Sequence, residues 1–294
     1  MIIRNPVYIK EIRVSNRSSR QICIFLIFNG LLAIMGLYVF GKIIRGMNQN
    51  DMVNYSMILE LYRILVTMEC GMILLILPGL TAGSISGERE RRTFDSMVGS
   101  MLSPLSIILG KLMSVMATVF ILLISSLPVL SLVFIFGGIR YTDIFLSFGG
   151  MFVLAFYIAS AGICFSSWGS RSLVSAIVSY AFLFLVTGGT VLISRGIQIL
   201  GVETNTVFEW GKYAVPWYHY FLLANPLFTF FAILNMQAGS HNVVLNFINY
   251  QYEYQPNLVT EHWILLSLIV QILIAVIFIC VATQGVKNKR DYKN

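Results

Sequence analysis

Six long apolar runs constrain this chain more than any other feature of its sequence. Each has about the 20 mostly apolar residues that a helix needs to cross ~30 Å of hydrocarbon. The runs are Gln21 to Gly41, Leu61 to Gly83, Ser106 to Gly137, Ile144 to Trp168, Leu173 to Ser194 and Trp263 to Gln284. With 57% hydrophobic and 11% charged residues, the chain has more apolar surface than one soluble domain could bury. The sequence therefore predicts an all-α integral membrane protein with six transmembrane helices, in which residues 1–294 form a single transmembrane domain.

The first 20 residues carry positive charge on one side of a helical pattern. Asn5-Pro6 has the residue types of a helix start, an N-cap followed by proline in the first turn. Four cations then share one narrow stripe: Lys10, Arg13, Arg17 and Arg20. We therefore expect residues 1–20 to form an interfacial helix on the bilayer. A cleaved signal peptide is the alternative, but the apolar run that follows is too long and has no small-residue cleavage site.

The distribution of lysine and arginine predicts the orientation. If the N-terminus is cytoplasmic, six of the 20 cations lie outside, which leaves fourteen inside. The six are Lys42, Arg45, Arg63, Arg140, Arg195 and Lys212. Because cytoplasmic loops carry the excess of positive charge, we expect a multi-pass protein of the plasma membrane with both termini in the cytoplasm. Residues 84–104 then also face the cytoplasm, where ATP is found.

The segment between the fifth and sixth runs is expected to lie outside. Within this outer region, residues 195–262, the stretch from Val215 to Met236 is apolar enough to suggest a seventh span. It contains His219, Asn225 and Pro226 at its middle, and a full crossing would leave the basic C-terminus outside. A re-entrant pair of short helices broken at Asn225-Pro226 satisfies both facts, provided that the break is buried in protein.

Residues 84–104 combine a charged cluster with an amphipathic pattern. Glu88 and Glu90 stand near the start of a helix, where the helix dipole favours anions, and Arg89, Arg91 and Arg92 supply donors for phosphates or carboxylates. Five apolar side chains follow at helical spacing: Phe94, Met97, Val98, Met101 and Leu102. The pattern leaves two interpretations open, a helix that rests in lipid headgroups and a helix that docks on a protein.

The order of residues in this segment resembles a known signature. Glu-Arg-Glu-Arg-Arg-Thr-Phe at residues 88–94, Ser-Pro-Leu-Ser at 103–106 and Gly110-Lys111 are similar to the cytoplasmic signature of type-2 ATP-binding-cassette (ABC) transporter permeases. There, E-R-E-x-G-T precedes a short helix, a Pro-Leu-Ser-like step and a G-K pair. This chain departs from the pattern at Arg92, where the family commonly has glycine. Beyond this short segment, the resemblance is one of topology.

The resemblance implies the permease subunit of an ABC transporter, an exporter in which two permeases, identical or related, work over two cytoplasmic ATPase subunits. ATP and Mg²⁺ would be bound by the ATPase partner, and this chain would hold no cofactor. The coupling helix would run from Thr93 to Leu102. The resemblance also implies an ATPase interface formed by Glu88, Arg89, Glu90, Arg91, Arg92, Thr93, Phe94, Met97, Val98 and Met101.

The sequence lacks the catalytic motifs that would indicate an enzyme. Gly36 to Lys42 superficially matches a phosphate-binding loop, but its intervening residues are bulky and Ile43 stands where the motif needs Ser or Thr. The three histidines lack H-E-x-x-H spacing, and no G-x-S-x-G elbow or metal-ligand cluster is present in the sequence. We therefore expect no catalytic and no metal site, and any ATP hydrolysis must come from a partner.

Polar residues within the apolar runs are candidates for a substrate path. Glu69 is the one acid deep within a run, and an isolated carboxylate there costs at least ~2.5 kcal/mol on insertion scales. It should be protonated, paired or next to a wet cavity, and a structural hydrogen bond between helices is the equal alternative. Asn29 and Gln271 are weaker candidates of the same kind, since such residues commonly link helices.

Two other classes of function stay open. The main alternative is a secondary transporter or channel that uses Glu69 as its ion-coupling site. Against it, the sequence shows no internal repeat and intramembrane charge is expected only at Glu69. A membrane scaffold or immunity subunit is the third class.

Overall fold

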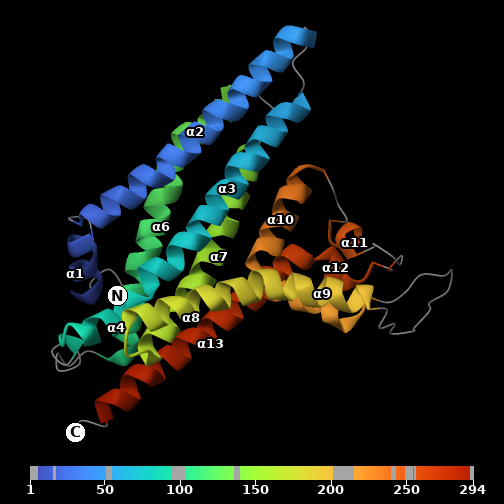
Figure 1. The fold of residues 1–294 in the computed structure, drawn as a ribbon. Coiled ribbons are helices and arrows are strands. Elements are labelled where there is room, and N and C mark those ends of the chain that lie inside the picture. The colour runs from blue at the N-terminus through green and yellow to red at the C-terminus, as the bar shows by residue number, and fades with distance from the viewer. Residues whose placement is uncertain are drawn as a thin grey trace.

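The structure is a computed structural model that describes residues 6–15, 18–50, 55–94, 103–135, 140–200, 215–239, 243–248, 254 and 256–291. All regular elements in these ranges are helices, in agreement with the all-α prediction. The bundle consists of α2 (Ser19–Asn50), α3 (Tyr55–Thr81), α6 (Pro104–Ile135), α7 (Tyr141–Trp168), α8 (Ser172–Phe184) with η2 (Leu185–Gly189) and α9 (Thr190–Ile199), and α13 (Trp263–Asp291) (Figure 1).

Six stretches of the described chain are long and apolar enough to cross a bilayer, as predicted. They are Gln21–Lys42, Leu59–Glu90, Pro104–Ser131, Tyr141–Trp168, Ser172–Ile199 and Trp263–Lys287. The chain is thus a multi-pass, all-α membrane protein. The second stretch is longer than the predicted run because α4 (Gly83–Glu90) follows α3 after a one-residue break.

Helix α7 is the centre of the bundle. It packs against α3, α4, α6, α8, α10 and α13. Small residues on α7 are buried in these contacts, among them Ala155, Ala159, Ala161 and Gly162. Because small side chains let neighbouring backbones approach closely, several helices can pack around this one helix. By contrast, the fifth span has few buried residues, and Leu173, Phe184 and Leu192 are exposed as a lipid-facing surface requires.

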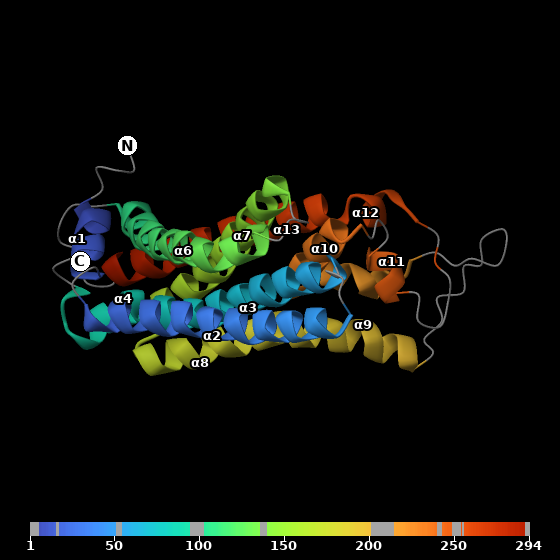
Figure 2. The ribbon, with the colours of Figure 1, turned by 90° about the horizontal axis from the view of Figure 1, so that it is seen from above.

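The two ends of the bundle differ. Figures 1 and 2 show α1 (Pro6–Ser15), α4 and the C-terminal end of α13 at one end, with α9, α11 (Val243–Ile248) and α12 (Leu258–Glu261) at the other. The described N-terminal helix is shorter than the expected 1–20 segment, because α1 ends at Ser15 and α2 begins at Ser19. Helix α1 packs against the start of α6.

The chain breaks at Asn225, between η4 (Trp217–Ala224) and α10 (Pro226–Gln237), which meet at 90°. Asn225 accounts for the break because Pro226 begins α10 and the Asn225 side chain caps it, accepting a hydrogen bond from the Phe228 amide at 3.0 Å. The side-chain amide of Asn225 also donates to the Thr187 carbonyl in the π-helix η2 at 2.8 Å. The break is therefore buried against the fifth span.

Candidate functional site

The charged segment that the sequence singled out begins with helix α4 and ends in a tight turn. Beyond its C-cap Arg91, the Arg92 amide donates to the Arg89 carbonyl at 3.0 Å and the Thr93 amide to the Glu88 carbonyl at 2.9 Å. This pair of bonds is the Schellman motif, which needs a left-handed residue after the C-cap. Arg92 has that conformation, with φ of 58°. Position 92 is thus one that favours glycine.

Helix α4 is attached to α7 at its first turn. Ser166 of α7 accepts hydrogen bonds from the Ile85 and Ser86 amides at 3.0 and 3.1 Å, and donates to the Ala82 carbonyl at 2.7 Å. Because the first amides of a helix lack partners within it, Ser166 acts as an N-cap supplied by another helix.

The other end of α4 is attached to the last turn of α7. The Arg89 guanidinium donates to the carbonyls of Gly169 at 2.6 Å and Ser167 at 2.5 Å. These carbonyls terminate α7, where a cation is favoured by the helix dipole. Arg89 also lies over the Phe94 ring, 4.8 Å from its centroid. Phe94 is only 8% exposed, so it packs within this chain.

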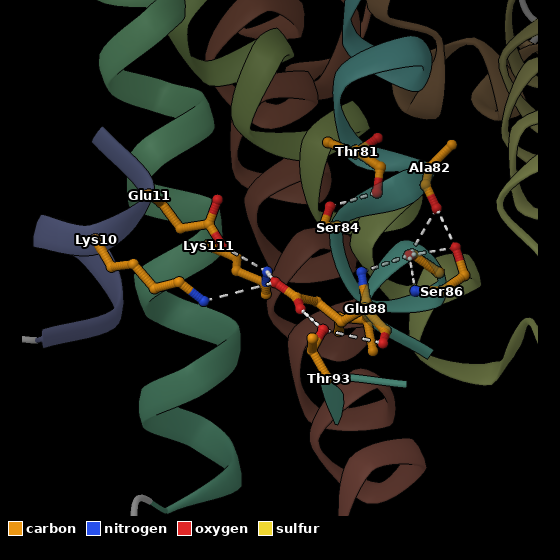
Figure 3. A network of polar contacts seen from close by, with 11 residues as sticks. Lys10, Glu11, Thr81, Ala82, Ser84, Ser86, Glu88, Thr93 and Lys111 are labelled. Atoms are coloured by element: carbon orange, nitrogen blue, oxygen red, sulfur yellow. Dashed lines mark hydrogen bonds and ion pairs between the residues drawn. The ribbon is translucent and has the colours of Figure 1, made fainter. Parts of the chain in front are cut away.

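Glu88 joins α4 to α1 and α6 through a network of charges (Figure 3). Its carboxylate accepts a hydrogen bond from the Thr93 hydroxyl and lies 3.8 Å from Lys111 Nζ and 3.9 Å from Lys10 Nζ. Lys111 in turn binds Glu11 Oε1 at 2.7 Å. The network therefore connects the N-terminal helix, the α4 turn and the start of the third span.

Lys111 is a buried charge that the sequence analysis did not single out. It lies within the third span and is 3% exposed. A buried ammonium needs a counterion, and Glu11 supplies one from 100 residues away in the chain. Sequence reasoning missed Lys10, Glu11 and Lys111 as site residues. The available signal was a lysine two turns inside an apolar run, which required an acidic partner.

The remaining residues of the expected ATPase interface differ in their surroundings. Glu90 accepts hydrogen bonds from the Ser172 amide at 2.9 Å and the Ser172 hydroxyl, at the start of α8. Arg91, Arg92 and Thr93 are exposed. Met97, Val98 and Met101, with most of the expected coupling helix, lie outside the described residues.

The predicted substrate-path residues fall into two groups. Glu69 is fully buried, and its Oε1 accepts a hydrogen bond from Ser126 of α6 at 2.5 Å, whereas its Oε2 has no partner among the described residues. Asn29 of α2 donates to the next serine of α6, Ser125, at 3.0 Å. Both side chains thus link their helices to consecutive positions of α6.

Gln271 belongs to a different cluster, at the helix break. Its amide donates to the Leu223 carbonyl at 3.2 Å and to Thr229 Oγ1 at 2.8 Å. Thr229 in turn shares a hydrogen bond of 2.5 Å with Ser267. Gln271 therefore donates to backbone carbonyls freed between η4 and α10.

The glycines at the end of α3 and in α4 form a surface for close packing. Gly79 lies near the Tyr180 hydroxyl, and Gly83 and Gly87 lie against Ser172. The helix that approaches them is α8 of the same chain.

No protein-family model matches this chain, and no curated protein is significantly similar to it. Within the described ranges, no group of three or more His, Cys, Asp or Glu side chains is arranged to hold a metal ion.

Proposed function

We propose that this chain is the permease subunit of an ABC exporter of the plasma membrane, driven by ATP hydrolysis in a separate cytoplasmic ATPase subunit and paired with a second permease. The chain itself would not be an enzyme. In this proposal α1 lies on the cytoplasmic surface, both termini are cytoplasmic, and the pair η4 and α10 is re-entrant from the outer side. Residues 93–102 would form the coupling helix.

The attachment of α4 to α7 supports this proposal most strongly. A docking segment transmits an ATPase stroke only if it moves together with the transmembrane helices. Ser166 caps the first turn of α4, and Arg89 fixes its last turn to the carbonyls of Ser167 and Gly169. Because α7 packs against most of the bundle, a displacement of the exposed turn at Arg91 to Thr93 would be passed to the spans.

The contacts also refine which residues would meet the ATPase. Glu88, Arg89 and Phe94 make contacts within the chain, so their role would be to hold the docking turn in position. Direct contact would then come from Arg91, Arg92 and Thr93, together with Met97, Val98 and Met101 of the apolar stripe.

Purification of the tagged chain from its own cells tests the proposal. We expect a soluble subunit that photolabels with an azido analogue of ATP to co-purify with it. Met97→Ala combined with Met101→Ala should reduce the captured ATPase roughly tenfold or more, because truncated interface anchors each cost about 1 kcal/mol or more. Phe94 is left intact because its truncation would also disturb packing. Met236→Ala, an exposed methionine at the opposite end, is the matched control.

A secondary transporter is the second candidate, supported by Glu69. Its buried carboxylate has one oxygen bonded to Ser126 and one without a partner in the described chain, a form that suits a proton-binding group. Glu69→Gln keeps the shape and removes the titratable group. If no nucleotide-binding subunit co-purifies and Glu69→Gln abolishes gradient-driven flux in vesicles, the permease proposal is wrong and this alternative replaces it.

A further inference from the structure

A cavity of about 890 Å³ lies among α1, α3, α4, α6 and α8, at the end of the bundle that contains the charge network. Helix α6 lines it with one stripe, Lys111, Ser114, Val115 and Thr118, at the spacing of a single helical face. The glycine-rich face of α3 and α4 forms the opposite wall. The volume lies within the ~300–1,000 Å³ typical of small-molecule sites.

The walls change from charged to apolar along the axis of the bundle. Lys10, Glu11 and Glu88 line the cavity at one end, and Leu80 and Ala176 line it as well. Thr118 stands about 10 Å further along α6 than Lys111, at ~1.5 Å per residue. Leu173 also lines the cavity and is 71% exposed, so the cavity is continuous with the lipid-facing surface of α8. A ligand that fits these walls is an amphiphile.

The charged groups of the cavity have unused hydrogen-bond donors and acceptors for a ligand that carries both a positive and a negative charge. Glu88 Oε1 lies 3.8 and 3.9 Å from two ammonium groups, beyond the ~2.7–3.2 Å of a hydrogen bond, so neither ammonium donates to it directly. Lys111 uses one of its three donors on Glu11. Arg91 lines the cavity, and within the described chain its backbone amide donates to the Gly87 carbonyl at 3.1 Å whereas its guanidinium has no ion pair or hydrogen bond. Carboxylates and cations are equal in number here: Glu11, Glu88 and Glu90 face Lys10, Arg91 and Lys111.

We propose that this cavity binds a phospholipid with a primary-ammonium zwitterionic headgroup, such as phosphatidylethanolamine. Its ammonium donates to Glu88, its phosphate accepts from Arg91 and Lys111, and its acyl chains leave past Leu173 along α8. A headgroup of this kind adds one charge of each sign and preserves the balance of the site. The inference needs only the membrane location of this chain, so it stands or falls independently of an ATPase partner.

Native mass spectrometry of the purified, delipidated chain tests this inference. Phosphatidylethanolamine, phosphatidylcholine and phosphatidylglycerol are added at equal concentration. We expect phosphatidylethanolamine to be retained roughly tenfold more than phosphatidylcholine, whose trimethylammonium cannot donate a hydrogen bond to Glu88. Arg91→Ala should reduce its retention several-fold, and Ala176→Trp should fill the cavity and abolish it. Lys42→Ala is the matched control. Lys42 is an exposed cation in the C-terminal half of α2 that does not line the cavity, so its truncation should not change the retention of phosphatidylethanolamine.

Equal retention of the three lipids, or a preference for the anionic phosphatidylglycerol, would overturn the proposal. So would retention that is insensitive to Arg91→Ala. Because the Arg91 side chain is exposed and makes no hydrogen bond or ion pair within the described chain, its truncation should leave the fold intact, and the test holds even if Ala176→Trp does not fold.

Discussion

Arg92 holds the left-handed backbone conformation that ends α4, with φ of 58°. A side chain with a Cβ costs about 1–2 kcal/mol in this conformation, whereas glycine adopts it freely. The turn around it is nonetheless closed by two backbone hydrogen bonds and by the Thr93 hydroxyl on Glu88. These bonds hold Arg92 in a backbone conformation that residues with a Cβ disfavour. Arginine at this position also places an exposed guanidinium on the turn, which glycine would not do.

Arg92→Gly is expected to stabilise the folded protein. Relief of the left-handed strain is partly offset by the larger entropy of glycine in the unfolded chain, which leaves a net gain of up to ~1 kcal/mol. Arg92→Ala keeps the strain and should be less stable than Arg92→Gly by about 1 kcal/mol. The midpoint of thermal unfolding in detergent measures both.

Arg91→Gly is the matched control for this prediction. Arg91 is the neighbouring exposed arginine, but its φ is −80°, in the right-handed region. Glycine there should destabilise by about 0.5–1 kcal/mol. Equal unfolding midpoints for Arg92→Gly and Arg92→Ala would contradict the conformation assigned to this turn.

At the scale of elements, the junction of α3 and α4 depends on its contact with α7. A Cβ added at Gly162 of α7 would collide with Thr81 Oγ1 and lie 2.8 Å from Thr81 Cβ. The Thr81 hydroxyl is fixed because it donates to the Leu77 carbonyl at 2.9 Å. The last turn of α3 therefore has no room to accept a larger residue on α7.

Gly162→Ala is expected to destabilise the protein by about 1–3 kcal/mol, since overpacking of a close helix contact forces the backbones apart. Gly149→Ala is its matched control on the same helix, because a Cβ there would meet nothing within 4 Å. That control should be neutral or stabilising by up to ~1 kcal/mol. Thermal unfolding of the two variants decides the point, and a neutral Gly162→Ala would show that the α3 and α7 contact is looser than described.

The elements that could be predicted from the sequence are those set by local pattern. The six spans follow from runs of apolar residues, and the break at Asn225-Pro226 follows from a capping residue and a proline in sequence. The partners of charged groups could not be predicted in this way. Glu11 and Lys111 are 100 residues apart, and only the packing of α1 on α6 brings them together.

The interface residues show the same limit at the level of single side chains. The stripe that begins at Phe94 is an amphipathic pattern, and such a pattern does not say which surface covers the apolar side. For Phe94 the cover is Arg89 of the same chain. The sequence suggests that Arg89 is a donor for an external phosphate or carboxylate. In the structure it instead donates to the Gly169 carbonyl at the C-terminal end of α7.

At the scale of the whole molecule, the end of the bundle at which a helix terminus lies predicts the side of the membrane that it faces. The fifth span ends at Ile199 with Leu200 as its C-cap, and α12 begins at Leu258, after the bent pair η4 and α10. Figure 2 shows α9 and α12 at the same end of the bundle. If η4 and α10 are re-entrant, both leucines face the outer side; if the pair crosses the membrane, they face opposite sides.

Single-cysteine labelling in intact cells separates these two topologies. In a chain whose four native cysteines are replaced by serine, Leu200→Cys and Leu258→Cys offer exposed thiols, since the leucines are 79% and 76% exposed. We expect a membrane-impermeant maleimide to label both, and to label Arg91→Cys only after permeabilisation, because α4 lies at the opposite end of the bundle, which we propose to be the cytoplasmic end. Labelling of Leu200→Cys without Leu258→Cys would establish a seventh crossing and move the C-terminus outside. Labelling of Arg91→Cys in intact cells would remove the α4 turn from the side where ATP is found, and with it the proposed contact to an ATPase.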